Sequence, residues 1–407
     1  MKPSEIVTTL SQRSADGRKG DRQLPVVTVV ARVVGVGKES TQRYSGTEVQ
    51  VGALIEGYLD AGGEVNLVCR KSALPDHPLL TVHTLSGPAR PSVIASPWFI
   101  LQATVAVARH GRGLIHSTGA LILGKADIAT VHFCHTAYAS RRLPTRAQRK
   151  NIWYRLNAWS ALKLNITMER RCYRPSKTHV LVGPSKGVLN DLTEHFAEVR
   201  DSTRVIHNGI DQRRFSLAEP SIRKRLRRDA RISEGAFAAV FVGGDWGRKG
   251  LRKAIEALAL APEWHLLVVG DGDQAEYRAI ADEYGVNSRI TFFGQRQDVE
   301  HIYWMSDALV FPSEYEVASL VTYEAASCGL PLLVSRINGT EELVIEGKNG
   351  WFVSSSTDIA RCLTSLARDP DLYVSMRAAA KQSSEPYSWP SMVTLYTQLY
   401  REIATRR

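Results

Sequence analysis

The chain alternates between short apolar runs and longer helical patterns, and this alternation occurs twice. In the first half, apolar runs rich in β-branched residues lie at 26–31 and 64–69 with a helical pattern at 49–59 between them, and the order recurs around 114–116 and 128–132. Apolar runs without polar alternation are typical of strands buried in a parallel sheet whose faces are covered by helices. The first half therefore predicts a doubly wound, Rossmann-like α/β domain.

The pattern restarts in the second half. A strand end at 204–206 meets an Asn-Gly turn, and a very basic stretch at 222–231 follows, which we interpret as a linker. A second series of strands and helices is predicted at 238–242, 251–259, 265–269, 275–284, 290–293, 308–311, 320–328 and 331–334. A chain of 407 residues is longer than one hydrophobic core usually organises. We therefore expect two Rossmann-like domains.

The sequence also predicts where these domains begin and end. Residues 1–24 are polar and charged without periodicity, and we expect them to form a disordered tail. The N-terminal domain is predicted at 25–203 and the C-terminal domain at 204–385. The last segment, 386–407, has a long amphipathic helical pattern, and we expect it to cross back and pack on the N-terminal domain.

Cysteine usage and hydropathy predict the compartment. The five cysteines are odd in number and scattered, without a Cys-x-x-Cys pair, which argues against a disulfide framework and against a metal site. The start of the chain lacks the apolar core of a signal peptide, and no stretch is expected to reach the about 18–20 apolar residues of a membrane span. These features predict a cytoplasmic protein.

Positive charge is concentrated in the first half of the chain. The formal net charge is +11, but residues 1–205 carry 28 Lys and Arg against 15 Asp and Glu, whereas residues 206–407 carry 24 against 26. A basic half predicts an anionic partner, for which a phospholipid surface, a phosphorylated acceptor and nucleic acid are the candidates.

The basic residues are densest at 141–177, where 11 Lys and Arg accompany one acid, Glu169. Trp153, Tyr154 and Trp159 lie between them. Helices that place tryptophan among lipid headgroups and cations on anionic lipid have this composition. We therefore favour an anionic membrane surface or an anionic acceptor as the partner. A merely solvated helix is the alternative, and nucleic acid is not expected.

Two carboxylates lie eight residues apart in a predicted strand-to-helix junction at 311–331. The first N–H groups of a helix have no intrahelical partner and carry the positive end of its dipole, so Ala318, Ser319 and Leu320 are predicted to bind phosphate oxygens. Glu324, one turn into the helix, is placed to accept hydrogen bonds from ribose hydroxyls. Glu316, on the loop, is placed to reach a sugar.

Two cations follow another predicted strand, in the glycine-rich turn at 243–250. Arg248 and Lys249 are fixed there between a strand and a helix, where they can face a diphosphate. The turn therefore predicts a diphosphate-binding site.

These motifs, in this order, resemble glycosyltransferase family 4. The carboxylate pair is similar to its Glu-x7-Glu signature, and the likeness covers most of the chain through Ser45-Gly46-Thr47-Glu48, Thr130-Val131-His132, Val182-Gly183-Pro184-Ser185, Val205-Ile206-His207-Asn208-Gly209-Ile210-Asp211, Gly247-Arg248-Lys249-Gly250, Phe293-Gly294 and Asn349-Gly350. The turn at 243–250 is most similar to that of lipopolysaccharide core glucosyltransferases.

The resemblance implies a GT-B fold, whose two domains face a cleft, and a retaining, metal-independent hexosyltransferase with no cofactor. The implied donor is a UDP- or GDP-linked sugar, and the implied acceptor is a cell-envelope glycan, lipopolysaccharide or a lipid-linked sugar.

The resemblance also implies roles for single residues. Lys249 and Arg248 would neutralise the leaving diphosphate, Glu316 would act at the sugar, and His132 would contact the donor sugar near the reacting carbon. His135 is the nearby alternative to His132.

Further donor contacts are implied for three residues. Gly46 and Gly244 would let the backbone approach the donor, and Arg296 would line the base pocket. The chain departs from the family at Ser45, where relatives have glycine, and at 317–319, where Val-Ala-Ser replaces Gly-Phe-Gly. A non-catalytic GT-B protein that binds a glycan or assists a partner is therefore the alternative function.

Overall fold

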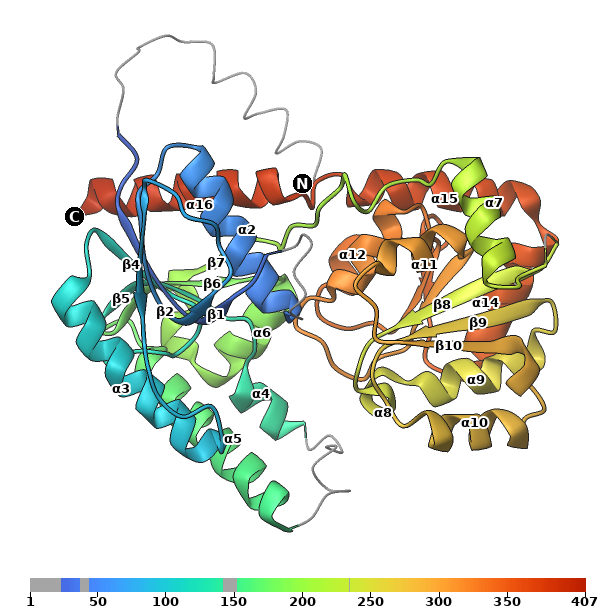
Figure 1. Cartoon of the computed structure of the whole chain (residues 1–407), viewed down its shortest axis with the longest axis horizontal. Coiled ribbons are helices and arrows are strands. Elements are labelled where there is room, and N and C mark those ends of the chain that lie inside the picture. The colour runs from blue at the N-terminus through green and yellow to red at the C-terminus, as the bar shows by residue number, and fades with distance from the viewer. Residues whose placement is uncertain (1–22, 37–43, 142–151, 234) are drawn as a thin grey trace, which may run out of the picture.

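The computed structural model describes residues 23–36, 44–141, 152–233 and 235–407. Two α/β domains lie side by side, and the helix α16 (Trp389–Arg406) extends from the second domain over the first (Figure 1). Each domain is built on its own sheet, in which every pair of neighbouring strands runs parallel. The predicted α/β architecture of two Rossmann-like domains is confirmed.

The N-terminal domain contains a seven-stranded sheet in the order β3-β2-β1-β4-β5-β6-β7. The order along the chain reverses between β1 and β4, so the loops after these strands diverge and leave a crevice at their carboxyl ends. In register, Val27 of β1 lies opposite Val65 of β2 and Leu114 of β4. The strands are β1 (Val27–Val34), β2 (Val65–Ser72), β3 (Leu80–Thr84), β4 (Leu114–Ser117), β5 (Ala126–Thr130), β6 (Thr178–Gly183) and β7 (Thr203–Val205). The helices are α2 (Gly46–Asp60), α3 (Ser92–His110), α4 (His135–Ser140), α5 (Ile152–Cys172) and α6 (Lys186–His195).

The C-terminal domain contains a six-stranded sheet in the order β10-β9-β8-β11-β12-β13, with its reversal between β8 and β11. The strands are β8 (Phe237–Val242), β9 (Trp264–Val269), β10 (Ile290–Gly294), β11 (Ala308–Phe311), β12 (Leu332–Val334) and β13 (Gly350–Phe352). The helices are α7 (Pro220–Asp229), α8 (Trp246–Lys249), α9 (Leu251–Leu260), α10 (Gln274–Glu283), α11 (Val299–Met305), α12 (Leu320–Ser327), α13 (Thr340–Leu343), α14 (Ser356–Arg368) and α15 (Pro370–Ser384).

Helix α16 returns to the N-terminal domain, as the amphipathic pattern at 386–407 predicts. Its apolar face lies buried in the same core as β1 and α2. Two tyrosines of this helix also reach the sheet, where Tyr400 hydrogen-bonds His116 Nδ1 (2.7 Å) and Tyr396 hydrogen-bonds Thr130 (3.0 Å). The last helix of the chain is therefore part of the core of the first domain.

The two segments that connect the domains lie against each other. The backbone N–H of Ile210 donates to Tyr387 O (3.0 Å), and the N–H of Trp389 donates to Ile210 O (3.2 Å). Gln50 of α2 bonds both backbone groups of Gly209, donating to its carbonyl (2.6 Å) and accepting from its N–H (3.1 Å). The connection is thus fastened to a helix of the N-terminal domain.

Two sequence predictions need correction here. The boundary predicted between 203 and 204 falls inside β7, which pairs with β6, so the first sheet continues to Val205. The stretch 222–231, predicted to be a linker, is largely helix α7. Arg223 and Arg227, one turn apart, both bond the Asp307 carboxylate (2.6 and 3.1 Å), and these ion pairs hold the basic segment as a helix. The predicted tail 1–24 lies almost wholly outside the described residues.

Helix α3 corrects a third prediction. By length and composition it is apolar enough to cross a membrane, which contradicts the expectation that no stretch reaches this hydropathy. One face packs on the sheet through Phe99 and Ala103, while Ile94, Trp98 and Leu101 on the other are 47–55% exposed. A soluble core helix passes the same test, so α3 alone is weak evidence for a membrane span.

Candidate functional site

A cavity of about 330 Å³ lies between the domains, where the crevices of the two sheets face each other. The N-termini of two helices contribute to its wall, α2 through Gly46 and Thr47 and α12 through Ser319 and Leu320. The helices approach closely there, because a Cβ built on Gly46 would lie 2.8 Å from Leu320 Cδ1. Two positive helix ends in one cavity favour an anionic ligand.

Three charged side chains meet on the side of this cavity that the C-terminal domain forms. Lys249 Nζ lies 2.8 Å from Glu316 Oε1, and Arg248 Nη1 lies 3.2 Å from the same oxygen. Ser313 also donates to it, at 3.1 Å. The three charged side chains are only 13–20% exposed. Arg248 Nε also lies 3.3 Å from Asp245 Oδ2, so two carboxylates balance the two cations. The excess positive potential that suits a diphosphate comes from the two helix N-termini, and the two cations supply directed hydrogen-bond donors.

The turn before this cluster explains why the cations face the cavity. Helix α8 ends at Gly250, whose φ of 80° is left-handed and favours glycine. The chain then restarts as α9, so Arg248 and Lys249 lie at the end of one short helix instead of inside a long one. Lys249 Nζ also lies 4.5 Å from the centre of the Phe311 ring, on the neighbouring strand β11.

The loop at 315–319 is held partly by the other domain. Ser185 at the start of α6 donates to Val317 O (2.8 Å), and the Arg141 guanidinium lies 5.0 Å from the centre of the Tyr315 ring. The Ser319 hydroxyl is buried and has no hydrogen-bond partner among the residues that the structure describes. The residues that replace Gly-Phe-Gly therefore form an ordered loop that links the domains and leaves a buried donor at the cavity.

Glu324 lies one turn into α12, beyond the residues that line the cavity. Its Oε2 accepts a hydrogen bond from Tyr303 (2.9 Å). Burial raises the pKa of the Glu324 carboxyl to about 7, although the Tyr303 hydrogen bond opposes this shift. At neutral pH the carboxyl is therefore near its titration midpoint.

His132 follows strand β5 and lines the cavity from the N-terminal side. Burial lowers the pKa of its imidazole to about 4, so the ring is neutral at pH 7. Both ring nitrogens of His135 are instead occupied, Nδ1 by Glu169 (2.8 Å) and Nε2 by Asn165 (3.0 Å). Of the two histidines, only His132 lines the inter-domain cavity.

Besides Glu324, two more predicted donor contacts do not line this cavity. Gly244 is exposed in the turn between β8 and α8. Arg296 forms an exposed ion pair with Asp298, its Nε lying 2.8 Å from Oδ1, and this contact lowers the pKa of the Asp298 carboxyl to about 2. The remaining predicted residues, His132, Lys249, Arg248, Glu316, Gly46, Ala318, Ser319 and Leu320, do converge there.

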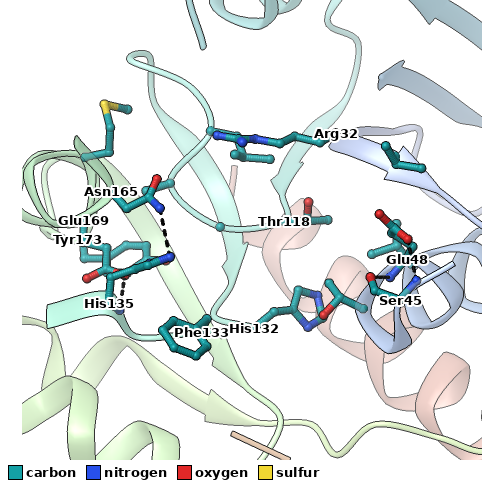
Figure 2. A pocket seen from close by; sticks show the side chains of 17 residues that line it. Arg32, Ser45, Glu48, Thr118, His132, Phe133, His135, Asn165, Glu169 and Tyr173 are labelled. Atoms are coloured by element: carbon teal, nitrogen blue, oxygen red, sulfur yellow. Dashed lines mark hydrogen bonds and ion pairs between the residues drawn. The ribbon is translucent and has the colours of Figure 1, made fainter. Parts of the chain in front are cut away.

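A second pocket of about 280 Å³ lies in the N-terminal domain and shares Thr47, His132 and Phe133 with the first (Figure 2). Sequence reasoning missed most of its lining, including Arg32 and Asn165. Arg32 lies near the carboxyl end of β1, a position that favours ligand contact in α/β sheets and was the available signal. Asn165 had no comparable signal.

Glu169 in this pocket has a structural task. Its carboxylate accepts from the backbone N–H groups of His135 (2.7 Å) and Thr136 (2.9 Å) at the start of α4, and from both of their side chains. The single acid of the basic region therefore orients His135. The described part of the chain contains no group of three or more His, Cys, Asp or Glu side chains placed to hold a metal ion.

Two family models match the chain in succession. The model for Glycosyltransferase Family 4 matches residues 44–214, and the model for Glycosyl transferases group 1 matches residues 222–383. The chain belongs to the GT-B glycosyltransferases of family 4. The two matches coincide with the two domains, and the cavity lies between them.

Within this family, the chain is 30% identical to the lipopolysaccharide glucosyltransferase WaaG of Escherichia coli K12, over 51% of this chain and 57% of that protein. It is 28% identical to the D-inositol 3-phosphate glycosyltransferase of Corynebacterium jeikeium, over 53% of this chain and 55% of that protein. The chain thus matches slightly more than half the length of these relatives.

Two solved structures share the fold. The crystal structure of WaaG superposes with a TM-score of 0.74 at 19% identity, over 92% of this chain and 99% of that chain. Anabaena HepE in complex with UDP and glucose superposes with a TM-score of 0.67 at 17% identity, over 93% of this chain and 100% of that chain.

Proposed function

We propose that the chain is a retaining hexosyltransferase that transfers a sugar from a UDP- or GDP-linked donor. The observation that carries this proposal is the convergence of Arg248, Lys249 and two helix N-termini on one cavity. A leaving diphosphate develops charge there, and fixed cations and N–H groups neutralise it without the cost of reorganising solvent. The same groups supply the role that a divalent cation has in other phosphate chemistry, which supports metal-independent transfer.

The acceptor is proposed to enter through the pocket of the N-terminal domain. His132 lines both cavities, so a molecule in one adjoins a molecule in the other at this residue. The neutral imidazole contacts the donor sugar in this proposal, and the leaving phosphate takes the acceptor proton on the same face. Similarity to WaaG supports a cell-envelope glycan, lipopolysaccharide or a lipid-linked sugar as the acceptor.

The activity is tested with a panel of UDP- and GDP-linked hexoses, measuring release of the nucleotide and the anomeric configuration of the product by NMR. We expect nucleotide release with one donor class and retention at the anomeric carbon. Inversion would contradict the proposed mechanism. If a nucleotide stabilises the protein thermally but no acceptor gives turnover, the alternative function is favoured. This alternative is a non-catalytic protein that binds a glycan or assists a partner, and it is motivated by the altered loop at 317–319.

We also propose that the enzyme works at the inner face of the plasma membrane without crossing it. Helices α3 and α5 lie side by side (Figure 1), joined where the N–H of Val93 donates to Asn157 Oδ1 (3.2 Å). Trp153 and Trp159 of α5 are 78% and 59% exposed beside the apolar outer face of α3. Exposed cations, Arg155 and Lys163 among them, accompany these rings, as expected for contact with anionic headgroups. Four further cations of the predicted basic region, at 142, 146, 149 and 150, lie outside the described residues.

Arg155→Gln is expected to lower binding to vesicles containing anionic lipid about fivefold, because one cation near such a surface contributes about 1 kcal/mol. Vesicle binding of the wild-type protein should also fall as salt rises, because salt screens the charges. A second variant, Trp159→Ser, should also lower vesicle binding, and this loss should persist at high salt because it does not depend on charge. Co-sedimentation with phosphatidylglycerol-containing and neutral vesicles measures both effects. Lys348→Gln in the C-terminal domain is the control, and equal binding to neutral and anionic vesicles would contradict the proposal.

A further inference from the structure

The pocket of the N-terminal domain contains a guanidinium that is not paired with the carboxylates in the pocket wall. Arg32 lies near the carboxyl end of β1 and lines this pocket together with Glu48 and Glu169. Figure 2 shows the Arg32 side chain along one side of the pocket, with Ser45 and Glu48 on one flank and Asn165 and His135 on the other. The pocket thus has one guanidinium and two carboxylates in its wall.

Both carboxylates already have hydrogen-bond donors of their own. Glu48 Oε2 accepts from the N–H of Ser45 (2.6 Å) in the capping box of α2. Glu169 accepts four hydrogen bonds at the start of α4, all between 2.7 and 2.9 Å. These bonds tie the carboxylates to helix ends, and neither carboxylate forms an ion pair with Arg32.

Arg32 makes no hydrogen bond or ion pair with any residue that the structure describes, and its contact is with the Phe99 ring, 5.8 Å from the guanidinium carbon. Arg70 is its neighbour across the β1–β2 ladder, because Ala31 pairs with Cys69. Both terminal nitrogens of Arg70 are bound by backbone carbonyls, those of Pro88 and Gly87 (2.6 Å each). Arg32 is an exposed residue of β1, and partial desolvation together with the positive charge of Arg70 lowers the pKa of its guanidinium.

We propose that Arg32 selects an acceptor that carries a phosphate group. The planar guanidinium forms two parallel hydrogen bonds to a phosphate, an arrangement that also fixes the orientation of the acceptor. The sugar part of such an acceptor occupies the polar pocket beside His132, where it meets the donor. This inference rests on the proposed transfer reaction, but the phosphate site itself is a binding property that is measurable without turnover.

Isothermal titration with glucose 6-phosphate and with glucose tests the proposal. Wild-type protein should bind glucose 6-phosphate more tightly than glucose, and Arg32→Met should weaken the phosphate ligand about tenfold while leaving glucose unchanged, since a charge-assisted bidentate contact is lost. Arg32→Lys, which keeps the charge without the planar fork, should recover part of the affinity. Lys125→Met removes an exposed cation of the same domain and serves as the control for net charge.

The donor cavity also attracts phosphate, so a second variant separates the two sites. Binding of glucose 6-phosphate should be insensitive to Lys249→Met if it occurs at Arg32. Dependence on Lys249 with no effect of Arg32→Met would overturn the inference, as would equal affinity for glucose and glucose 6-phosphate. No donor is present in this titration, so its result does not depend on transfer. Absence of transferase activity would contradict the proposed function without changing the result for the phosphate site.

Discussion

Replacing Lys249 by alanine is expected to lower turnover by about 10²–10³-fold, the usual consequence of removing a preorganised group that stabilises transition-state charge. The effect should appear mainly in kcat, because the negative charge of the diphosphate grows as the sugar leaves. The variant should remain folded, since Glu316 keeps its contacts with Arg248 (3.2 Å) and Ser313 (3.1 Å). Steady-state kinetics with the preferred donor measures the loss.

The matched control for this experiment is Lys253→Ala. Lys253 lies in the first turn of α9, outside the cavity lining. It should leave kcat unchanged. Calorimetric Kd values for the free nucleotide diphosphate separate ground-state binding from catalysis. If Lys249→Ala weakened nucleotide binding as much as it lowered turnover, the lysine would hold the substrate without favouring the transition state.

Glu324→Gln is expected to weaken donor binding about 5–30-fold at pH 8, because the predicted charge-assisted hydrogen bond to the ribose would become a neutral one. The pKa of the wild-type carboxyl is raised to about 7, so wild-type affinity should rise between pH 6 and pH 8 as the carboxylate forms. Affinity of the variant should stay flat over that range. Titrations of the donor at several pH values measure this difference.

Glu324→Gln should weaken donor binding but stabilise the fold. Because the pKa of the Glu324 carboxyl is higher in the folded state, ionisation of this group lowers the free energy of unfolding. This destabilisation is fully present above pH 7 and disappears as pH falls toward the ordinary carboxyl pKa near 4.5. Glu324→Gln should therefore raise the Tm at pH 8 and change it little at pH 5. Glu314→Gln, at an exposed glutamate of the same domain, is the control. Unaltered discrimination between ribose and 2′- or 3′-deoxyribose donors would show that Glu324 does not read the ribose.

Much of the fold could be predicted because it depends on local periodicity. The strand predicted at 308–311 matches β11, and the helix predicted at 320–328 matches α12 to within one residue. Helix α7 was misjudged because it has only two apolar residues, Ile222 and Leu226, among five basic ones, a composition that is also typical of a solvated linker. It is stabilised by Asp307, a residue far along the chain. Helix α3 was misjudged because it is apolar on both faces, and composition does not reveal which face packs.

The site was predictable where its motifs are contiguous. The turn that carries Lys249 and the junction that carries Glu316 each have a recognisable spacing, and the structure brings them within 2.8 Å. The contact between Ser185 and Val317 joins residues from two domains, and no local pattern encodes it. Arg296 does not line the cavity, and its guanidinium pairs with Asp298, which would compete with the predicted base of the donor.

The return of α16 to the first domain has a consequence for biosynthesis. The ribosome adds residues 389–406 only after the entire C-terminal domain, yet these residues complete the core that contains β1 and α2. At about 5–20 residues per second, the nascent N-terminal domain waits roughly 10–40 seconds with the seat of α16 uncovered. Its apolar surface is then available to chaperones or to other nascent chains. The second domain can finish folding during translation, whereas the first is completed only when the last helix docks.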